Sequence, residues 1–270
     1  MPGGVSLYAV SDGHAEATER AFAQQARTFA DARLNRVLTS ESEWVFARLA
    51  VHARDLVLDL AAGTGLGSRA LAAKVRAVVA LDATPAMLEV GRAEAEREGL
   101  ANIVFQRGDA AALPFLDGSF TIVVCRYALH HFPDRDAVMS EIARVLRPYG
   151  RLGLADLVAD EHADRADAHN AIERMRDPSH VCALSASGLQ ALIVDHGLEA
   201  TAAETREVRR PLGPWLEQSA TPPDARVEIQ RRLLEEIEGG QKTGLQPQHE
   251  ADGALSFVHT LTSVFALKPG

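Results

Sequence analysis

The chain has 270 residues, 47% of them hydrophobic and 24% charged, which is typical of a folded globular protein and excludes disordered and collagen-like chains. Its 28 basic and 37 acidic residues give a net charge of −9, which disfavours nucleic acid or an anionic membrane surface as a partner. Two cysteines are too few for a disulfide framework and no apolar run approaches the roughly 20 residues that span a bilayer, so we expect a cytoplasmic protein without membrane insertion.

The first part of the chain has a helical pattern. An alanine-rich segment over residues 14–38 places Phe22 and Phe29 seven residues apart, and therefore on one face of a helix. A second helix is expected over residues 42–50.

From residue 56 onward, short apolar segments of strand length alternate with helical segments. Because these strands are apolar along their whole length, they are typical of a parallel sheet that helices cover on both faces. We therefore predict a doubly wound α/β domain. The expected strands are 56–60, 77–81, 103–106, 120–125 and 151–157, and the expected helices are 67–74, 85–98 and 135–146.

The later part of the chain is less regular. Two helices are expected over 160–176 and 187–196, and two strands over 198–209 and 256–267. Between these strands, residues 211–253 contain Pro, Gly and one amphipathic helix at about 224–237.

A glycine-rich turn follows the first predicted strand. Gly63 and Gly65 allow a sharp turn and the close approach of a ligand, although many turns of this kind use glycine for shape alone. A dinucleotide site would have a third glycine at Ser68 and no acidic residue before the turn. The carboxylate of Asp59 stands there instead, which suits a ligand with a positively charged amino group. The turn therefore favours an amino-acid-bearing nucleoside over NAD.

Two further carboxylates follow the next two strands. Asp82 ends the second strand, where a carboxylate can accept hydrogen bonds from both hydroxyls of a ribose, and Asp109 follows the third. The carboxyl ends of parallel strands border one crevice, where open α/β sheets bind their ligands. We expect Asp59, Asp82 and Asp109 to share that crevice.

At the glycine-rich turn and these three acidic residues, the sequence resembles the class I S-adenosylmethionine-dependent methyltransferases. The resemblance is narrower to the branch (methyltransferase type 11) that includes the ubiquinone and menaquinone biosynthesis methyltransferases, and it runs over residues 56–181. Its motifs occur in the family's order and spacing at residues 59–67, 79–88, 108–115, 128–134 and 145–152.

The resemblance implies a fold and a domain organisation. The fold would be a Rossmann-like, seven-stranded sheet whose last strand is antiparallel. Residues 1–45 would form an N-terminal helical lid, and residues 46–270 the methyltransferase domain. Small cap insertions at 158–186 and 211–253 would enclose a small-molecule acceptor.

The resemblance also implies S-adenosylmethionine as the cofactor. The loop at Ala61, Gly63 and Gly65 would wrap its methionine part, while Asp59 helps to orient its amino group. Asp82 would hold the ribose hydroxyls. Ala61 departs from the family, which often has glycine at this position.

Further matching positions would contact the rest of the cofactor. Met87, or Ala83 beside it, would pack on the adenine ring. Asp109 would accept a hydrogen bond from the adenine amino group, and the backbone of Ala110 would meet the ring. Arg126 would offer its carbonyl oxygen to the amino group of the methionine part.

Catalysis requires little beyond positioning, because the sulfonium of the cofactor already activates the methyl group. A general base is needed only where the accepting atom carries a proton. His131, after the fourth strand, and His180, in the insertion that commonly borders the acceptor pocket, are the candidate bases. The alternative is that His130 and His131 only shape their loop. We expect no metal, because His130, His131 and Asp134 lack a recognised ligand spacing.

These features predict a methyltransferase that acts on an oxygen, nitrogen or carbon of a small, apolar or aromatic molecule. The alternative is a protein of the same fold that uses S-adenosylmethionine structurally or for a reaction without methyl transfer. An NAD-linked oxidoreductase is disfavoured by Asp59 and Ser68. The pattern leaves the acceptor and the oligomeric state open.

Overall fold

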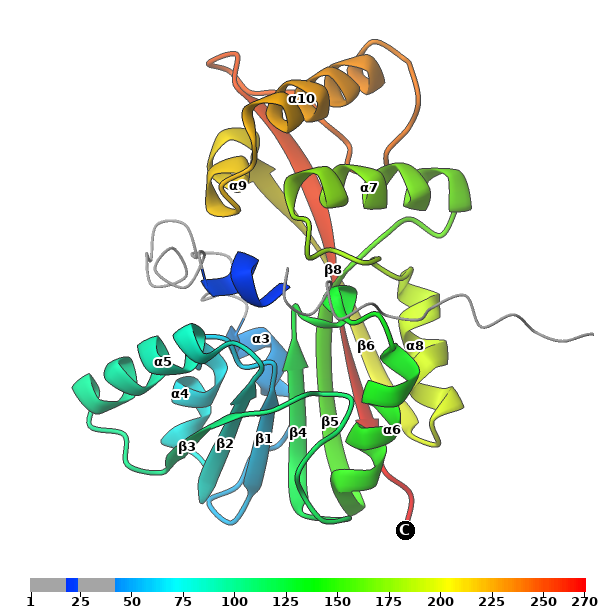
Figure 1. The fold of residues 1–270 in the computed structure, drawn as a ribbon. Helices are drawn as coiled ribbons and strands as arrows, with labels where there is room; N and C mark the ends of the chain where they lie inside the picture. Colours follow the sequence, from blue (N-terminus) through cyan, green and yellow to red (C-terminus); the bar gives the residue numbers. More distant parts are fainter. Residues whose placement is uncertain (1–17, 24–41) are drawn as a thin grey trace, which may run out of the picture.

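An eight-stranded sheet forms the centre of the protein (Figure 1). The computed structural model describes residues 18–23 and 42–270. The strand order is β3-β2-β1-β4-β5-β8-β6, with β7 paired to β8; β1 to β5 are parallel, and β8 is antiparallel to its neighbours β5 and β6. This topology confirms the predicted Rossmann-like sheet with an antiparallel last strand. The strands are β1 Leu56–Leu60, β2 Ala77–Asp82, β3 Ile103–Arg107, β4 Phe120–Arg126, β5 Leu146–Val158, β6 Glu199–Pro211, β7 Gln248–His249 and β8 Leu255–Leu267.

Helices cover both faces of the sheet. Val57 packs with α3 and α4, whereas its neighbour Leu58 packs with α6 and α8, because successive side chains of a strand point to opposite faces. The helices are α3 Ser42–Ala47, α4 Leu66–Ala72, α5 Pro85–Arg97, α6 Arg135–Val145, α7 Ala163–Arg176, α8 Ala186–Asp195, α9 Leu212–Gln218 and α10 Pro223–Ile237, with a 3₁₀ turn at Leu129–His131. Among the described residues, no helix has the length and apolar character to cross a bilayer.

Several helices begin where the sequence provides a cap. The side chain of Asp134 accepts a hydrogen bond from the backbone N–H of Ala137 at the start of α6, and Ser185 does the same for Gly188 at the start of α8. Pro85 occupies the first turn of α5, where its missing N–H is not needed.

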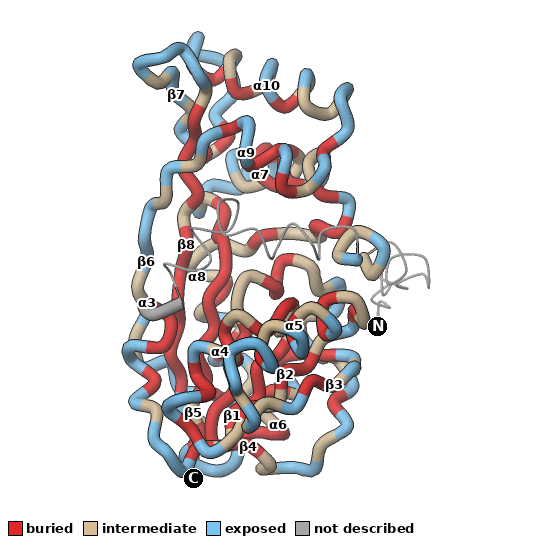
Figure 2. Tube along the Cα trace, turned by 90° about the vertical axis from the view of Figure 1, so that its left-hand side faces the viewer, coloured by how far each residue is buried: buried red, intermediate tan, exposed pale blue. Residues whose placement is uncertain are grey.

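The strands β6 and β8 extend beyond the core into a second layer of helices, the cap, formed by α7, α9 and α10 (Figure 1). Trp215, Phe257, Ile172 and Leu233 are among the apolar side chains that form its own buried cluster. Figure 2 shows these buried segments of α7 and α9 beside the buried upper part of β8. The cap therefore stands on the ends of the same strands that form the core.

Three features of the structure were not predicted. Helix α9 and the two-residue strand β7 lie within the segment expected as an irregular insertion. Helix α9 has only seven residues, of which Gly213 and Pro214 are poor helix formers, so its own pattern is weak. Strand β5 begins at Leu146 rather than at residue 151. Tyr149 adopts a left-handed backbone (φ 60) there, the conformation that glycine takes most readily.

Candidate active site

A cavity of about 880 Å³ lies between the carboxyl ends of the parallel strands and the cap. Its volume is within the range of small-molecule sites. Its walls come from the loops after β1 to β4, from the described helix 18–23, and from α7, α9, β6 and β8 of the cap side. Elements far apart in the sequence thus enclose one space, as the ribbon shows for the short helix 18–23 between core and cap (Figure 1).

Asp82 presents a fixed carboxylate to this cavity. Its Oδ2 accepts a hydrogen bond from the backbone N–H of Gly63 at 2.8 Å, and its Oδ1 accepts one from the N–H of Thr84 at 2.8 Å. Burial raises the pKa of this carboxyl, while those backbone donors oppose the rise. Each carboxylate oxygen has a further lone pair, so the group can also accept hydrogen bonds from two ligand hydroxyls.

Asp59 is buried at the end of β1, also on the cavity wall. Its Oδ2 accepts a hydrogen bond from the hydroxyl of Ser68 at 2.6 Å. Burial raises the pKa of the Asp59 carboxyl, and the nearby charge of Arg126 lowers it. Gly67 leaves room for this pair, because a Cβ there would lie 2.8 Å from the Arg126 guanidinium and 3.0 Å from Asp59 Oδ2. The hydroxyl of Ser68, at the position where a dinucleotide loop would have glycine, anchors the Asp59 carboxylate.

The glycine-rich loop has an unusual backbone. Ala61, Gly63 and Gly65 all have positive φ angles, of 52°, 55° and 68°. A Cβ at Gly65 would meet the ring of Phe105 at 2.7 Å, and Gly65 does not line the cavity, so its glycine is required by packing. Ala61 and Gly63 do line it. A positive φ is unfavourable for residues other than glycine, so the backbone of Ala61 is strained.

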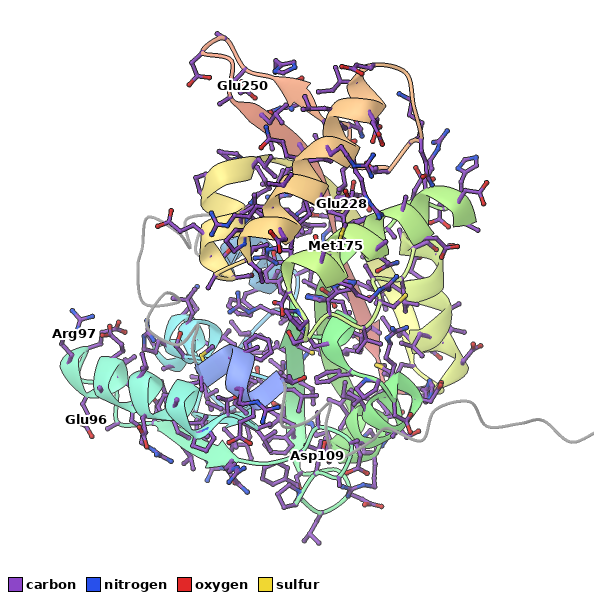
Figure 3. The ribbon with its side chains drawn as sticks, turned by 45° about the horizontal axis from the view of Figure 1, so that its top comes forward. Glu96, Arg97, Asp109, Met175, Glu228 and Glu250 are labelled. Atoms are coloured by element: carbon purple, nitrogen blue, oxygen red, sulfur yellow. The ribbon has the colours of Figure 1, made fainter. Side chains whose placement is uncertain are left out.

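The other predicted cofactor positions lie on the same side of the cavity. Ala83, Met87, Asp109, Ala110 and Arg126 all line it. Asp109 follows β3, and its Oδ1 accepts a hydrogen bond from the backbone N–H of Ala111 at 2.9 Å. Figure 3 labels Asp109 on the core side of the molecule. Apart from Gly65, the structure brings the predicted cofactor residues together around one cavity.

His131 lines the cavity, and a hydrogen bond to the backbone of Ser179 fixes the orientation of its ring. Its Nδ1 lies 3.0 Å from the carbonyl oxygen of Ser179, which can only accept, so the hydrogen is on Nδ1 and the neutral ring keeps a lone pair on Nε2. Burial and the neighbouring His130 lower the pKa of His131 to about 4. His131 is therefore an unprotonated acceptor at neutral pH.

His130 also lines the cavity but has a different environment. Its Nδ1 lies 2.5 Å from Oδ1 of Asp156, and its backbone N–H donates to Oδ2 of the same carboxylate at 3.0 Å. Burial alone would lower the pKa of His130, but the charge and hydrogen bond of Asp156, together with the charges of Glu173 and Asp177, outweigh it, so the pKa is raised. Asp156 was not predicted as a functional residue, since only the fold brings the end of β5 to this loop.

We expect Asp156→Asn to lower the free energy of unfolding by about 3 kcal/mol, because it leaves a buried imidazolium without its counter-ion. The raised pKa of His130 means that the pair stabilises the protein fully below pH 6.5, and that this contribution is lost as the pH rises through the raised value. Urea unfolding at several pH values should therefore show the largest difference between the two proteins below pH 6.5. The surface pair of Asp136 with His196 offers the control Asp136→Asn, which should stay close to wild type. A difference that grows above pH 6.5 would contradict this assignment.

His180 does not line the cavity. It is buried behind the two other histidines, with its ring 5.3 Å from that of His130, and its Nε2 lies 2.7 Å from Oδ1 of Asn170. Burial lowers the pKa of His180 to about 2. In this position it supports the loop around residues 177–183 and does not face the space where an acceptor would bind.

The described helix 18–23 borders the same cavity through Thr18, Glu19 and Phe22. The ring of Phe22 meets that of His131 edge-on, with centroids 4.9 Å apart, and Glu19 pairs with Arg107 at 3.2 Å. Of the other residues of the predicted lid, 42–45 belong to α3, where Trp44 and Val45 are buried in one cluster with Val57 of β1. Residues 1–17 and 24–41 lie outside the described residues.

The cap side of the cavity carries residues to which the sequence pattern assigned no role. Arg176, Arg210, Trp215, Gln218 and His259 all line it. They come from α7, β6, α9 and β8, so no local spacing could have linked them.

Behind this wall, His169, Glu173 and His259 form a buried cluster whose ligand atoms lie within 4.8 Å of one another. Such a set can hold a metal ion. Here Oε1 of Glu173 lies 2.8 Å from Nε2 of His259, and Oε2 lies 3.6 Å from the guanidinium of Arg176. The pKa of Glu173 is held well below its ordinary value by its histidine and arginine neighbours, against the effect of burial. The spacing of His169 and Glu173, four residues apart on a helix, is the one local signal for this cluster.

Buried histidines predict an acid-sensitive fold. Burial lowers the pKa of His259 to about 4 from the ordinary 6.5, so between these values the unfolded chain binds more protons than the folded one. The free energy of unfolding should thus decrease as the pH falls from 6.5 to 4, with His259 contributing on the order of 3 kcal/mol. Denaturant unfolding across this range should show a shallower decrease for His259→Gln. The control is His249→Gln at an exposed position, which should keep the wild-type slope. Parallel curves for wild type and His259→Gln would refute the expectation.

Comparison with known proteins shows which proteins this chain resembles. A family model described as a methyltransferase domain matches residues 57–150. YcgJ of Bacillus subtilis (strain 168), an uncharacterized methyltransferase, is 38% identical over 173 residues, which cover 64% of this chain and 68% of YcgJ. The demethylmenaquinone methyltransferase of Lactobacillus johnsonii is 39% identical over 115 residues, covering 41% of this chain and 47% of that protein. The chain thus spans about half the length of several curated relatives that it matches.

Solved structures agree with these matches. The crystal structure of YcgJ from Bacillus subtilis aligns with a TM-score of 0.77 and 30% identity, covering 86% of this chain and 99% of YcgJ. A putative methyltransferase from Bacillus halodurans C-125 aligns with a TM-score of 0.79 and 29% identity, covering 86% of this chain and 100% of that one.

Proposed function

Because the chain belongs to the S-adenosylmethionine-dependent methyltransferases, we propose that it transfers the methyl group of this cofactor to an oxygen, nitrogen or carbon of a small molecule. The observation that carries the proposal is the cavity itself. The carboxylates of Asp59, Asp82 and Asp109 line its core side, and a neutral imidazole, that of His131, lines the same space.

The residues present fit the cofactor. Both oxygens of Asp82 are already oriented by backbone donors and retain lone pairs for the two ribose hydroxyls. Asp59 can accept from the amino group of the methionine part, with Ala61 and Gly63 beside it. Gly63 has no atom within 4 Å of the place where a Cβ would stand, which leaves its surroundings open to a ligand.

Other residues would surround the adenine ring of the cofactor. We assign the adenine to Met87, Ala83 and Ala110, with Asp109 accepting from its amino group, because all four line the same side of the cavity. Arg126 stands beside Asp59, with its guanidinium 5.3 Å from the centroid of the Phe46 ring. Its charge partly balances that carboxylate.

Methyl transfer requires this chain to position the cofactor and the acceptor and to exclude water from them. S-adenosylmethionine, when bound, supplies a methyl group on a sulfonium, which needs no further activation. The cap segments 158–186 and 211–253, with the lid 1–45, would enclose the acceptor and hold its nucleophilic atom in line. Phe22 and His131 border this space. Nε2 of His131 can accept a proton from a hydroxyl, amine or activated carbon, or orient that group by a hydrogen bond.

Methyl transfer is tested with S-adenosylmethionine carrying a labelled methyl group and fractionated small-molecule extracts. We expect label to appear in one or a few acceptor molecules, in step with formation of S-adenosylhomocysteine. Conversion of a substrate while the cofactor stays intact would instead establish a reaction without methyl transfer. Absence of S-adenosylmethionine binding would refute the proposal altogether.

A further inference from the structure

The cap side of the cavity is basic, in contrast to its acidic core side. Arg176, the last residue of α7, and Arg210 of β6 both line it. Nη2 of Arg176 lies 3.4 Å, and Nη2 of Arg210 3.3 Å, from the same oxygen, Oε1 of Gln218. Figure 3 labels Met175, the residue before Arg176, on the cap side of the molecule and Asp109 on the core side. Two guanidinium groups are therefore held together at the end of the cavity opposite the proposed nucleoside site.

Few anionic groups of the described residues lie near these two guanidinium groups. Arg176 lies over the ring of Trp215, 4.8 Å from its centroid, and 3.6 Å from Glu173, whose other oxygen is engaged by a histidine. Within residues 18–23 and 42–270, Arg210 makes no ion pair with a carboxylate, and its hydrogen bond is to the neutral Gln218. Burial and the charge of Arg176 lower the pKa of Arg210 to about 10, and the charge of Glu173 opposes this decrease only in part. Holding a partly buried cation without an ion-pair partner among the described residues is costly, and an anionic ligand would supply the missing charge.

We infer that Arg176 and Arg210 bind an anionic group, a carboxylate or a phosphate, carried by the acceptor. Guanidinium groups present forked N–H donors that match both of these groups, and both arginines line the cavity while Gln218 accepts from one donor of each. Nε of Arg176 also donates to the carbonyl oxygen of Trp215 at 3.2 Å. This inference rests on the proposed function, because it places the acceptor between the cap arginines and the cofactor site at Asp82.

The arrangement also separates charges along the cavity. The acids at the strand ends suit a cofactor that carries a sulfonium and an ammonium, whereas the cap arginines suit the opposite charge. An acceptor with an anionic end would thus be oriented with that end in the cap and the rest of the molecule toward His131. Specificity for a charged acceptor follows from this polarity. With a neutral analogue, Arg210 would keep only the neutral Gln218 as a hydrogen-bond partner among the described residues, and Arg176 would keep only its contact with Glu173 as an ion pair.

The test uses two pairs of probes of matched shape: benzoate against benzamide, and phenyl phosphate against the neutral phenyl methanesulfonate. Each is titrated by calorimetry into the full chain, with and without saturating S-adenosylhomocysteine, whose own affinity is measured separately. We expect an anionic probe to bind at least about tenfold more tightly than its neutral partner, as for hydrogen bonds to a charged group. The pair that shows the larger difference identifies the anion as carboxylate or phosphate.

The variants are Arg210→Gln and the neighbouring Arg209→Gln. Arg209 is exposed, does not line the cavity and precedes Arg210 on β6, so its substitution controls for loss of charge on the same strand. Arg210→Gln should remove the preference for the anionic probe and leave the affinity for S-adenosylhomocysteine unchanged. Because Arg210 makes no ion pair with a carboxylate in the described part of the chain, we expect the Arg210→Gln variant to unfold at a temperature equal to or above that of wild type. Arg210→Lys, which keeps the charge, should retain part of the preference.

Equal affinity of wild type for charged and neutral probes would overturn the inference, and so would an unchanged preference in Arg210→Gln. A loss of S-adenosylhomocysteine affinity in Arg210→Gln, with competition between that ligand and the anionic probe, would also overturn it, because the arginines would then hold the carboxylate of the cofactor. Absence of S-adenosylhomocysteine binding in wild type would refute the proposed function instead, and the titration without it still reports on the anion site.

Discussion

Replacing Asp82 with alanine should weaken the binding of S-adenosylmethionine by about 10²- to 10⁴-fold. The carboxylate is expected to accept from two ribose hydroxyls, and a hydrogen bond to a charged group contributes about 1.5–3 kcal/mol. The same substitution removes the acceptors of the N–H groups of Gly63 and Thr84, which orient the binding loop. Both effects act in the same direction, and calorimetric titration of wild type and variant measures their sum.

The control for this experiment is Glu89→Ala, which removes an exposed carboxylate from the neighbouring helix α5. It should bind the cofactor as wild type does. Asp82→Asn keeps the shape of the side chain and one acceptor oxygen, so its affinity should fall between those of wild type and Asp82→Ala. Equal affinities of wild type and Asp82→Ala would remove Asp82 from the cofactor site, while thermal unfolding shows whether each variant is folded.

Replacing His131 with alanine should lower kcat for methyl transfer by about 10²- to 10⁴-fold where the accepting atom carries a proton, which is the usual contribution of a positioned base. The affinity for S-adenosylhomocysteine should change little, because His131 belongs to the side of the cavity that faces the acceptor. Since the pKa of His131 is lowered to about 4, wild-type activity should be constant near neutral pH and should decrease as the pH falls toward that value.

The matched control is His162→Ala, since His162 is an exposed histidine of the same chain. It should retain wild-type activity. A variant that loses affinity for the acceptor but keeps kcat would show that His131 orients the acceptor rather than accepting a proton. A His131→Ala profile of kcat against pH that coincides with the wild-type profile, in both height and shape, would remove His131 from catalysis.

Much of the core could be predicted because its signals are local. Strand β1 was predicted with its observed bounds, and β2, β3 and β4 within one residue at their ends, since each is a short apolar run between turn residues. The cap was harder to predict. Helix α9 is short and contains glycine and proline, and it is stable because Trp215 and Leu216 pack against residues of α7 and β8 that are distant in sequence.

The candidate site likewise has residues that the sequence could predict and residues that it could not. Asp59, Asp82 and Asp109 lie at or just beyond the carboxyl ends of three successive parallel strands, and the topology alone brings such positions to one edge of the sheet. The two histidines could not be ranked from sequence. His131 reaches the cavity whereas His180 packs against Asn170, a difference that depends on how the loop after α7 folds back.

By itself, the sequence determined the alternation of strands and helices, the turn after β1 and the acids at the strand ends, because these depend on periodicity and on neighbours along the chain. Only the tertiary structure decided that Asp156 raises the pKa of His130, and that Arg176, Arg210 and Gln218 meet in the cap. These contacts join α7, β6 and α9 across long sequence separations, and their electrostatics depend on burial, which local pattern does not contain. The acidic end of the cavity could therefore be predicted from the sequence, and the basic end could not.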